Sequence, residues 1–328
     1  MPSILVLGDI NVDVLMRVLA YPPPGGEALT ERVDTRLGGS AANTAVVLSR
    51  LGLEARLLAR VGDDAWGQVA LASLAEAGVG LELVQRDSTE TTGMMFTVVT
   101  PDGERTMFGQ RGANLRTDPA AITPDTLGGA GHLHLSGYAL LESPQRQAAL
   151  RAVELAVYQK LTISLDTAYL PALEAPQALR QLLPYLDACI LGLAEARALV
   201  GEGEPRAAGA ALLGTGVRLA ALKLGAQGCL LADAASTHYI QAFPVQVVDT
   251  TGAGDAFTAG LIYGRLQGMR LPALGTLANA LGGLAATVHG AGIALPGKAE
   301  VRQFLEGVLA SYSGDRFRSI SEVLQRLS

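Results

Sequence analysis

Residues 247–257, V-V-D-T-T-G-A-G-D-A-F, combine in one short stretch the residue types that phosphate chemistry needs. Gly252 and Gly254 have no Cβ, so the backbone can bend sharply there and approach a ligand closely. The apolar run that follows predicts a helix, whose first N–H groups lack partners within it and would bind a phosphate in transfer. Asp255 would repel that anion unless it has another task, and taking a proton from an attacking hydroxyl is such a task.

A helix cap after a glycine turn is the alternative interpretation, and the tetrapeptide G-A-G-D alone would favour it. The longer string at 249–257 is more specific, because D-T-T-G-A-G-D-A-F resembles the C-terminal signature of the ribokinase-like (PfkB) family of carbohydrate and nucleoside kinases. Residues 38–45, G-G-S-A-A-N-T-A, resemble the N-terminal signature of the same family. The resemblance implies transfer of the γ-phosphoryl group of ATP to a hydroxymethyl of a ribose- or fructose-like carbohydrate.

In this family the aspartate of the C-terminal signature is the general base, and the backbone amides around it form the anion hole. The resemblance therefore implies a catalytic group made of Asp255 with Gly252, Ala253 and Gly254. It also implies that Asp13 holds two acceptor hydroxyls, because a carboxylate accepts well from a vicinal diol. The acceptor-binding residues implied in this way are Asn11, Asp13, Gly38, Gly39, Asn43 and Glu142. From spacing alone, Asp13 is equally compatible with a solvated residue on an exposed strand.

The resemblance also implies where ATP and its metal ions would bind. The residues that would hold ATP, in a turn after a predicted strand and in a later apolar helix, are Lys223, Gly225, Gly228 and Asn279. Glu195 would organise Mg²⁺ through water, and Asp249 with Thr251 would help to hold a monovalent cation such as K⁺. Without the resemblance, the Lys223 turn is explained nearly as well by a hairpin with one exposed lysine.

Several positions depart from the family pattern. Ser40 stands where ribokinases usually have a lysine, and Gly192 stands where the family usually has an asparagine near the Mg²⁺ site. Many sugar-acid kinases of the family have an asparagine and an arginine after the strand that ends at Asp166, whereas a threonine and an alanine follow it here. No basic cluster is evident near Asp13, which disfavours a phosphorylated acceptor. An adenosine-like nucleoside kinase and a sugar-binding homologue that has lost catalysis remain alternatives.

Predicted strands and helices alternate from end to end, which indicates a mainly parallel sheet covered by helices on both faces. We therefore expect a single ribokinase-like α/β domain over 1–328, built as a three-layer α/β/α sandwich. The resemblance adds a small β-sheet lid, formed by about 12–37 and 91–111 with a hairpin turn at 101–103, and a homodimer through this lid. Arg105 and Arg111 on the hairpin are within reach of a phosphate, although hairpin arginines are more often solvated.

Composition argues against other classes of protein. The formal charge of −6 argues against a nucleic-acid partner, which usually needs a basic face. No basic run precedes the first strand pattern, so no signal peptide is predicted. Cys189 and Cys229 stand apart in apolar surroundings, as buried thiols do in a reducing cytoplasm. The low-charge stretch 271–296 is interrupted by glycines and polar residues, which favours a buried helix over a membrane span. We expect a cytoplasmic enzyme without a membrane partner.

Overall fold

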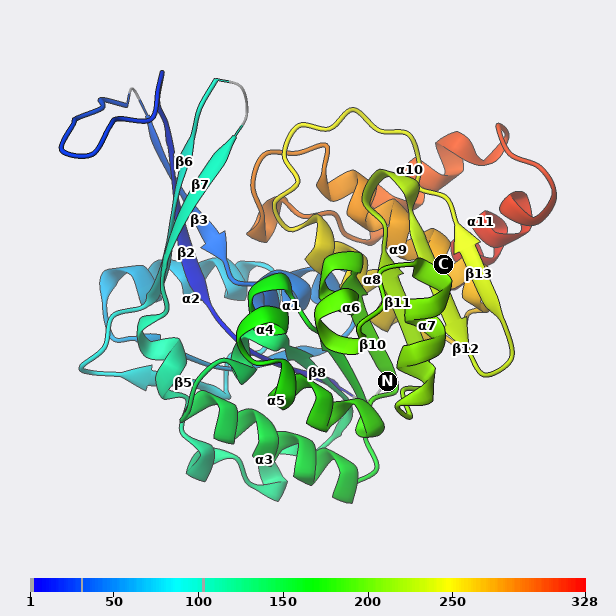
Figure 1. The fold of residues 1–328 in the computed structure, drawn as a ribbon, viewed down its shortest axis with the longest axis horizontal. Helices are drawn as coiled ribbons and strands as arrows, with labels where there is room; N and C mark the ends of the chain where they lie inside the picture. Colours follow the sequence, from blue (N-terminus) through cyan, green and yellow to red (C-terminus); the bar gives the residue numbers. More distant parts are fainter. Residues whose placement is uncertain (1–2, 31, 102–103) are drawn as a thin grey trace.

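The structure is a computed structural model and describes residues 3–30, 32–101 and 104–328 (Figure 1). Its centre is a nine-stranded sheet in the order β13-β12-β11-β10-β9-β8-β1-β4-β5. The strands are β1 (Ser3–Leu7), β4 (Ala55–Gly62), β5 (Val84–Asp87), β8 (Ala130–Ser136), β9 (Thr162–Asp166), β10 (Ala188–Gly192), β11 (Leu219–Lys223), β12 (Cys229–Asp233) and β13 (Thr237–Ile240). Neighbouring strands pair parallel along the sheet order β11-β10-β9-β8-β1-β4-β5. At the other end, β12 and β13 add an antiparallel edge. The predicted mainly parallel sheet is confirmed.

Helices cover both faces of this sheet. One face carries α1 (Ser40–Arg50), α2 (Ala65–Glu76), α8 (Ala253–Leu266), α9 (Leu271–Ala285), α10 (Lys298–Leu309) and α11 (Gly314–Arg326). The other carries α3 (Gln145–Tyr158), α4 (Tyr169–Glu174), α5 (Pro176–Leu182), α6 (Leu193–Val200) and α7 (Pro205–Gly214). A strand covered on both faces has no solvent side, so β1 reads as the fully buried run S-I-L-V-L. The predicted three-layer sandwich is therefore confirmed.

The low-charge stretch at 271–296 begins with α9, which ends at Ala285 and packs against α8 and α11. Most of α9 is buried, because it lies between the sheet and its neighbouring helices. Across the described part of the chain, no helix has both the length and the apolar character needed to cross a membrane.

A second sheet of four strands rises from one end of the body (Figure 1). Its order is β3-β2-β6-β7, with β2 (Asn11–Arg17), β3 (Val33–Gly38), β6 (Gly93–Val99) and β7 (Arg105–Gln110). Residues 102 and 103 of the predicted hairpin turn lie outside the described residues. We call these four strands the small sheet.

The register of the small sheet decides which side chains share a face. Asp13 of β2 pairs with Arg36 of β3 and with Met95 of β6, and Met95 pairs with Gly109 of β7. Because side chains alternate along a strand, Arg105 lies on the same face as Gly109. Asp13, Arg36 and Arg105 therefore share one face of the small sheet, although they are far apart in the sequence.

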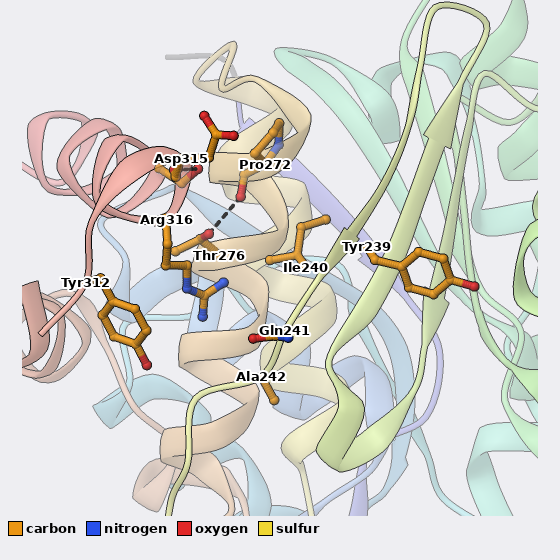
Figure 2. A pocket seen from close by; sticks show the side chains of 10 residues that line it. Tyr239, Ile240, Gln241, Ala242, Pro272, Thr276, Tyr312, Asp315 and Arg316 are labelled. Atoms are coloured by element: carbon orange, nitrogen blue, oxygen red, sulfur yellow. Dashed lines mark hydrogen bonds between the residues drawn. The ribbon is translucent and has the colours of Figure 1, made fainter.

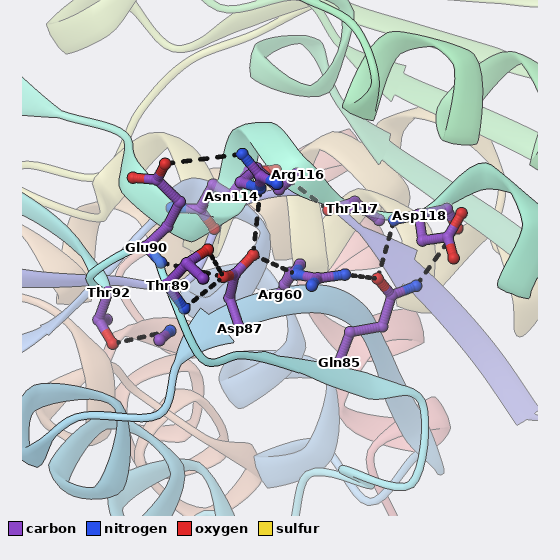
Figure 3. A network of polar contacts seen from close by, with 11 residues as sticks. Arg60, Gln85, Asp87, Thr89, Glu90, Thr92, Asn114, Arg116, Thr117 and Asp118 are labelled. Carbon is purple, nitrogen blue, oxygen red and sulfur yellow. Dashed lines mark hydrogen bonds and ion pairs between the residues drawn. The ribbon is translucent and has the colours of Figure 1, made fainter.

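A polar network fixes the segment that follows β7 (Figure 3). Asp87, at the end of β5, accepts a hydrogen bond from Arg60 Nε over 2.9 Å and lies 3.4 Å from Arg116 Nε. Its other oxygen accepts from two backbone amides of the following turn. Arg116 ends the 3₁₀ helix Gly112–Arg116, so the network anchors this helix to the main sheet. The same helix carries Asn114, which holds the segment after β1 through the backbone of Ile10.

Candidate active site

Asp255 lies in the first turn of α8, after a glycine that the backbone requires. Gly252 is the N-cap of α8 with a φ of 76°, a left-handed conformation that glycine adopts without strain. A Cβ at this position would lie 2.9 Å from the side chain of Leu295. The carboxylate of Asp255 accepts hydrogen bonds from Ser40 Oγ over 2.7 Å and from Asn43 Nδ2 over 2.8 Å. The two signature strings therefore meet at one carboxylate.

The electrostatics of the site centre on two carboxyl groups. Burial raises the pKa of Asp255 to about 6, against the opposing effect of the hydrogen bonds from Ser40 and Asn43. Burial, and then the negative charge of Asp255, raise the pKa of Asp13 to about 7. Both carboxyl groups therefore change charge close to neutral pH, and each is poised to exchange a proton there.

Glycines let β3 and α1 approach these carboxyl groups. Gly39 is the N-cap of α1 with a φ of 95°, and a Cβ on Gly38 would collide with the carboxylate of Asp13. Asn43, in the first turn of α1, donates to Asp255 and accepts from the backbone N–H of Gly292 over 3.0 Å. The structure thus brings the predicted acceptor residues of α1, β2 and β3 together around Asp255.

Two other predicted acceptor residues lie differently. Asn11 begins β2, and its Oδ1 accepts a hydrogen bond from Asn114 Nδ2 over 2.8 Å. Glu142 is exposed just before α3. Within 3–30, 32–101 and 104–328, no side-chain hydrogen bond joins Glu142 to the other predicted acceptor residues. The structure therefore places Asn11 at the base of the small sheet and leaves Glu142 apart from this hydrogen-bonded group.

Lys223, at the end of β11, lies close to the N-terminus of α8. Its Nζ donates to the two oxygens of Asp166, over 2.9 and 2.8 Å, and would lie 3.8 Å from a Cβ placed on Gly254. Thr258 Oγ1 donates to the same carboxylate over 2.6 Å. Burial alone would lower the pKa of Lys223, but the charges of Asp166 and Glu195 outweigh it and raise that pKa. A fixed ammonium therefore stands beside the N-terminal end of α8.

Glu195 caps α6 and occupies the space that Gly192 leaves open. Its Oε2 accepts from the backbone N–H of Gly192 over 2.7 Å and from Thr167 Oγ1 over 2.9 Å. Among the described residues, no group of three or more His, Cys, Asp or Glu side chains is arranged to hold a metal ion. This donor set fits Mg²⁺ held mainly by phosphate oxygens and water, since Mg²⁺ usually takes only one or two protein carboxylates.

The predicted nucleotide-binding glycines form a tight turn between β11 and β12. Gly225 and Gly228 have φ values of 59° and 98°, in the region that favours glycine. Asn279 of α9 donates through Nδ2 to the carbonyls of Ile240 and Gln241, over 2.9 and 3.2 Å. Its amide group therefore ties α9 to the end of β13.

A cavity of about 290 Å³ lies beside this junction, between β13, α9 and α11 (Figure 2). Gln241, just after β13, and Thr276 of α9 line it on one side, and Tyr312 and Arg316 line it from the C-terminal region. The guanidinium of Arg316 stacks 4.1 Å from the ring centre of Phe243. The cavity therefore adjoins the start of the segment that leads to Asp249.

Asp249 and Thr251, the predicted monovalent-cation residues, are joined to the small sheet. Arg105 donates to Asp249 Oδ1 over 3.3 Å, to Thr251 Oγ1 over 2.9 Å and to Thr250 Oγ1 over 3.0 Å. Asp249 Oδ2 accepts from the backbone N–H of Gly290 over 2.9 Å. Despite its burial, hydrogen bonds from Thr251 and Gly290 and the charge of Arg105 lower the pKa of Asp249. Arg105 therefore joins the small sheet to the loop before α8, and is not simply solvated.

Arg111, just after β7, is held by an ion pair with Asp9, which follows β1. It forms a two-pronged ion pair with Asp9, from Nε over 3.1 Å and from Nη2 over 2.9 Å. Gln145 Nε2 donates to Asp9 Oδ1 over 2.7 Å. Asp9 follows β1, so this pair ties the end of the small sheet to the carboxyl edge of the main sheet.

Three residues of the site were missed by the interpretation of the sequence. Asp166 ends a buried strand, and its neighbour in the sheet, β10, lies next to β11 with Lys223. The order of the parallel strands brings these residues together, and this order cannot be predicted from the local sequence around either residue. Asp9 follows the end of β1 and offered the same strand-end signal. The position of Arg36 opposite Asp13 depends on the register between β2 and β3, which is known only from the paired strands.

Comparisons with known proteins identify the family of the chain. Residues 1–298 match the model of the pfkB family of carbohydrate kinases, and the chain belongs to this family. It is similar to an ATP-dependent ribose-1-phosphate kinase from Halopiger xanaduensis, with 32% identity over 292 residues, covering 89% of this chain and 94% of that protein. It is also similar to a probable fructokinase-4 from Arabidopsis thaliana, with 29% identity, covering 82% and 87%. A solved ribokinase from the same plant, in complex with ribose and ATP, matches with a TM-score of 0.82 and 25% identity, covering 92% and 98%.

The protein is therefore a phosphotransferase that acts on an alcohol group. More narrowly, it is a ribokinase-family sugar or nucleoside kinase, and its fold is the ribokinase fold.

Proposed function

We propose that the protein transfers the γ-phosphoryl group of ATP to a hydroxymethyl of a ribose- or fructose-like carbohydrate, with Asp255 as the general base. The observation that carries this proposal is the position of Asp255. Its carboxylate is half-buried in the first turn of α8, its pKa is raised to about 6, and two donors from α1 fix its orientation. A base with a pKa near the working pH is efficient, because it is largely deprotonated yet still accepts a proton readily.

The residues around Asp255 have matching roles in the proposed mechanism. Asp13 accepts hydrogen bonds from two acceptor hydroxyls, and Gly38, Gly39 and Asn43 line the acceptor side. Asn11 and Glu142 are further acceptor residues in this proposal, although Glu142 lies apart from the group that is hydrogen-bonded to Asp255. Asp255 takes the proton of the attacking hydroxyl. The amides of Gly252, Ala253, Gly254 and Asp255 stabilise the developing charge at the N-terminus of α8. Phosphoryl transfer depends mainly on positioning and charge stabilisation, so this compact arrangement is chemically sufficient.

The nucleotide would lie along the turn between β11 and β12. Lys223, already fixed beside α8 by Asp166, would face the phosphates, and Gly225 and Gly228 would let the backbone approach the nucleotide. Asn279 would support the adenine side from α9. When bound, Mg²⁺ would neutralise phosphate charge, and Glu195 would hold its water ligands.

We also propose that the small sheet acts as a lid over the acceptor and as a dimer face. The face of the small sheet that carries Asp13 lies toward Asp255, whose negative charge raises the pKa of Asp13. The opposite face exposes apolar side chains: Phe96 and Phe108 are a cross-strand pair with 36% and 53% of their surfaces exposed. A second copy of the chain could cover this exposed apolar pair in a dimer. Light scattering of wild type and Phe108→Glu tests this, and an unchanged mass of one chain in both would exclude the dimer.

An ATP-consumption screen over pentoses, hexoses and nucleosides tests the proposed reaction. A carbohydrate that triggers ADP release, with its phosphate ester identified by mass spectrometry, is the expected result. Turnover restricted to nucleosides would replace the proposal with a nucleoside kinase. Sugar binding without ATP consumption would support the non-catalytic homologue and would contradict the role of Asp255.

A further inference from the structure

The C-terminal segment closes the cavity of about 290 Å³ that lies between β13, α9 and α11 (Figure 2). Tyr312 and Arg316, which line it, both follow residue 298, where the match to the family model ends. The facing wall includes the apolar side chains of Ile240, Ala242 and Pro272. Pockets for small molecules usually measure about 300–1,000 Å³, so this cavity suits a small ligand. It depends on a part of the chain that lies outside the family match.

Arg316 is held in this cavity by aromatic side chains. Its guanidinium lies 4.1 Å from the ring centre of Phe243 and 5.5 Å from that of Tyr312. Phe243 in turn packs edge-on against Phe304 and Tyr312, with ring centres 5.2 and 5.9 Å apart. Figure 2 shows the side chain of Arg316 extending toward Thr276 of α9. The guanidinium is therefore positioned in the cavity before any ligand binds.

This guanidinium has no anionic partner. As far as the structure describes the chain, Arg316 takes part in no ion pair, and its buried Nη2 has no hydrogen-bond partner. Asp315 also lines the cavity, but its side chain is 90% exposed and pairs with Arg318. Glu322, on the same helix, pairs with Arg270. The carboxylates of α11 are therefore taken by other arginines, and the charge of Arg316 is left without a counterion.

The surroundings of Arg316 make this charge costly. Burial lowers the pKa of Arg316, and the groups that oppose this shift are the phenol of Tyr312 and the thiol of Cys229, not a carboxylate. A charged group that loses contact with water without gaining a counterion loses solvation free energy. A bound anion would offset this loss and would supply the acceptor that Nη2 lacks.

The cavity is separate from the proposed ATP and acceptor sites. Pro272 and Thr276 line it from the first half of α9. Ala286, just after α9, accepts hydrogen bonds from the backbone N–H groups of Val248 and Asp249, close to the turn that precedes α8. Thr276 and Ala286 are ten positions apart, which is about 15 Å along a helix. None of the described residues assigned to ATP, its metal ions or the acceptor lines the cavity.

We propose that this cavity is a binding site for a small organic anion, whose carboxylate or phosphate pairs with Arg316 and whose apolar body packs against Ile240, Ala242 and Pro272. Guanidinium groups bind both kinds of anion in a two-pronged geometry, so an unpartnered Nη2 suits either. The site is additional to those of ATP and the acceptor, and it does not depend on the proposed kinase reaction.

Calorimetric titration of the full chain with four probes tests this site: benzoate, phenyl phosphate, benzyl alcohol and inorganic phosphate. Benzyl alcohol carries the ring without the charge, and inorganic phosphate carries the charge without an apolar body. We expect benzoate or phenyl phosphate to bind once per chain and at least about tenfold more tightly than either of these two. The stronger of the two binders tells a carboxylate site from a phosphate site. Equal binding of benzyl alcohol or of inorganic phosphate would overturn the proposal, as would no binding of both organic anions.

Two variants connect the binding to the cavity. Arg316→Met should weaken it by about 10- to 100-fold, the usual effect of losing a hydrogen bond to a charged group. Ala242→Leu should also weaken it, because the larger side chain fills the cavity and leaves Arg316 in place. Arg318→Met is the matched control, since it removes the same charge from an exposed pair on the same helix and should keep the affinity. Melting temperatures without ligand identify a folding defect. Unchanged affinity in either folded cavity variant would overturn the assignment.

A non-hydrolysable ATP analogue separates this site from that of the nucleotide. The titration is repeated with the chain saturated with adenylyl imidodiphosphate. An unchanged affinity for the anionic probe supports an additional site, whereas competitive displacement would show that the cavity belongs to the ATP site and would overturn the inference. If the analogue itself does not bind, the kinase proposal fails, and the probes and variants alone decide on the cavity.

Discussion

Ser40 donates its hydroxyl proton to Asp255 Oδ1 over 2.7 Å, which links two residues 215 positions apart in the chain. Ser40 is uncharged, so this partner of the Asp255 carboxylate is neutral. Asn43 supplies the second donor, so the orientation of the carboxylate does not depend on a charged neighbour.

Replacing Asp255, the proposed general base, with asparagine removes a proton acceptor and keeps the shape of the side chain. Asp255→Asn should lower kcat by about 10²- to 10⁴-fold, the usual worth of a general base, while nucleotide binding largely survives. Steady-state kinetics and a nucleotide titration check this. Asp125→Asn is the control, because it makes the same change at an exposed position distant in the sequence from Asp255. Turnover near that of the wild type in Asp255→Asn would refute the role.

The activity should fall on the acid side of neutrality. Asp255 must be ionised to take a proton, and its pKa is raised to about 6, so kcat/KM should decline as the pH falls through that value. Ser40→Ala removes a hydrogen bond that lowers this pKa, so the acid limb should move to higher pH, whereas Ser40→Thr should keep it in place. Identical pH profiles in the wild type and Ser40→Ala would contradict this assignment.

Lys223 should be important for stability as well as for the phosphates. Lys223→Met leaves Asp166, whose side chain is 6% exposed, without its cation, and should reduce the free energy of unfolding by about 3–5 kcal/mol. Urea unfolding measures the loss. Arg151→Met breaks the exposed pair with Glu154 and should change the free energy by less than about 1 kcal/mol. Equal losses in both variants would show that burial of the pair is not the cause.

Arg105 should decide how much the protein depends on a monovalent cation. In the structure its guanidinium already neutralises Asp249 and binds Thr251. We therefore expect the wild type to respond weakly to K⁺, and Arg105→Met to become more dependent on it. The measurement is kcat in K⁺ and in choline at equal ionic strength. A strong K⁺ requirement in the wild type would instead favour a bound cation beside Asp249.

Asp87 should stabilise the protein above acid pH. Hydrogen bonds from Glu90 and Thr89 and the charge of Arg60 outweigh burial and lower the pKa of this carboxyl in the folded protein. Its contribution is therefore complete above the ordinary aspartate range and is lost as the pH falls through the lowered value. Asp87→Asn should cost about 1–3 kcal/mol at pH 7, with the difference from wild type shrinking below about pH 4. A difference that is constant with pH would contradict this linkage.

The sequence predicted those parts of the structure that depend on local rules. Gly252 takes the left-handed conformation expected of a glycine before a helix, and α8 begins at Ala253 with the carboxylate of Asp255 in its first turn. The layered fold followed from the alternation of apolar strands and helices. In contrast, Asp166 beside Lys223, and Arg36 opposite Asp13, result from strand order and register, which distant segments determine together.

Because Ser40 and Asn43 each hold a different oxygen of Asp255, the plane of that carboxylate cannot turn freely. A sugar offers several hydroxyls of nearly equal reactivity, and a base whose plane is fixed acts only on the hydroxyl that the bound acceptor presents to it. If Asp255 is the base, an acceptor bound in one orientation should give one positional isomer of the phosphate ester. Removing the hydrogen bond from Ser40 or from Asn43 should therefore give a mixture of positional isomers.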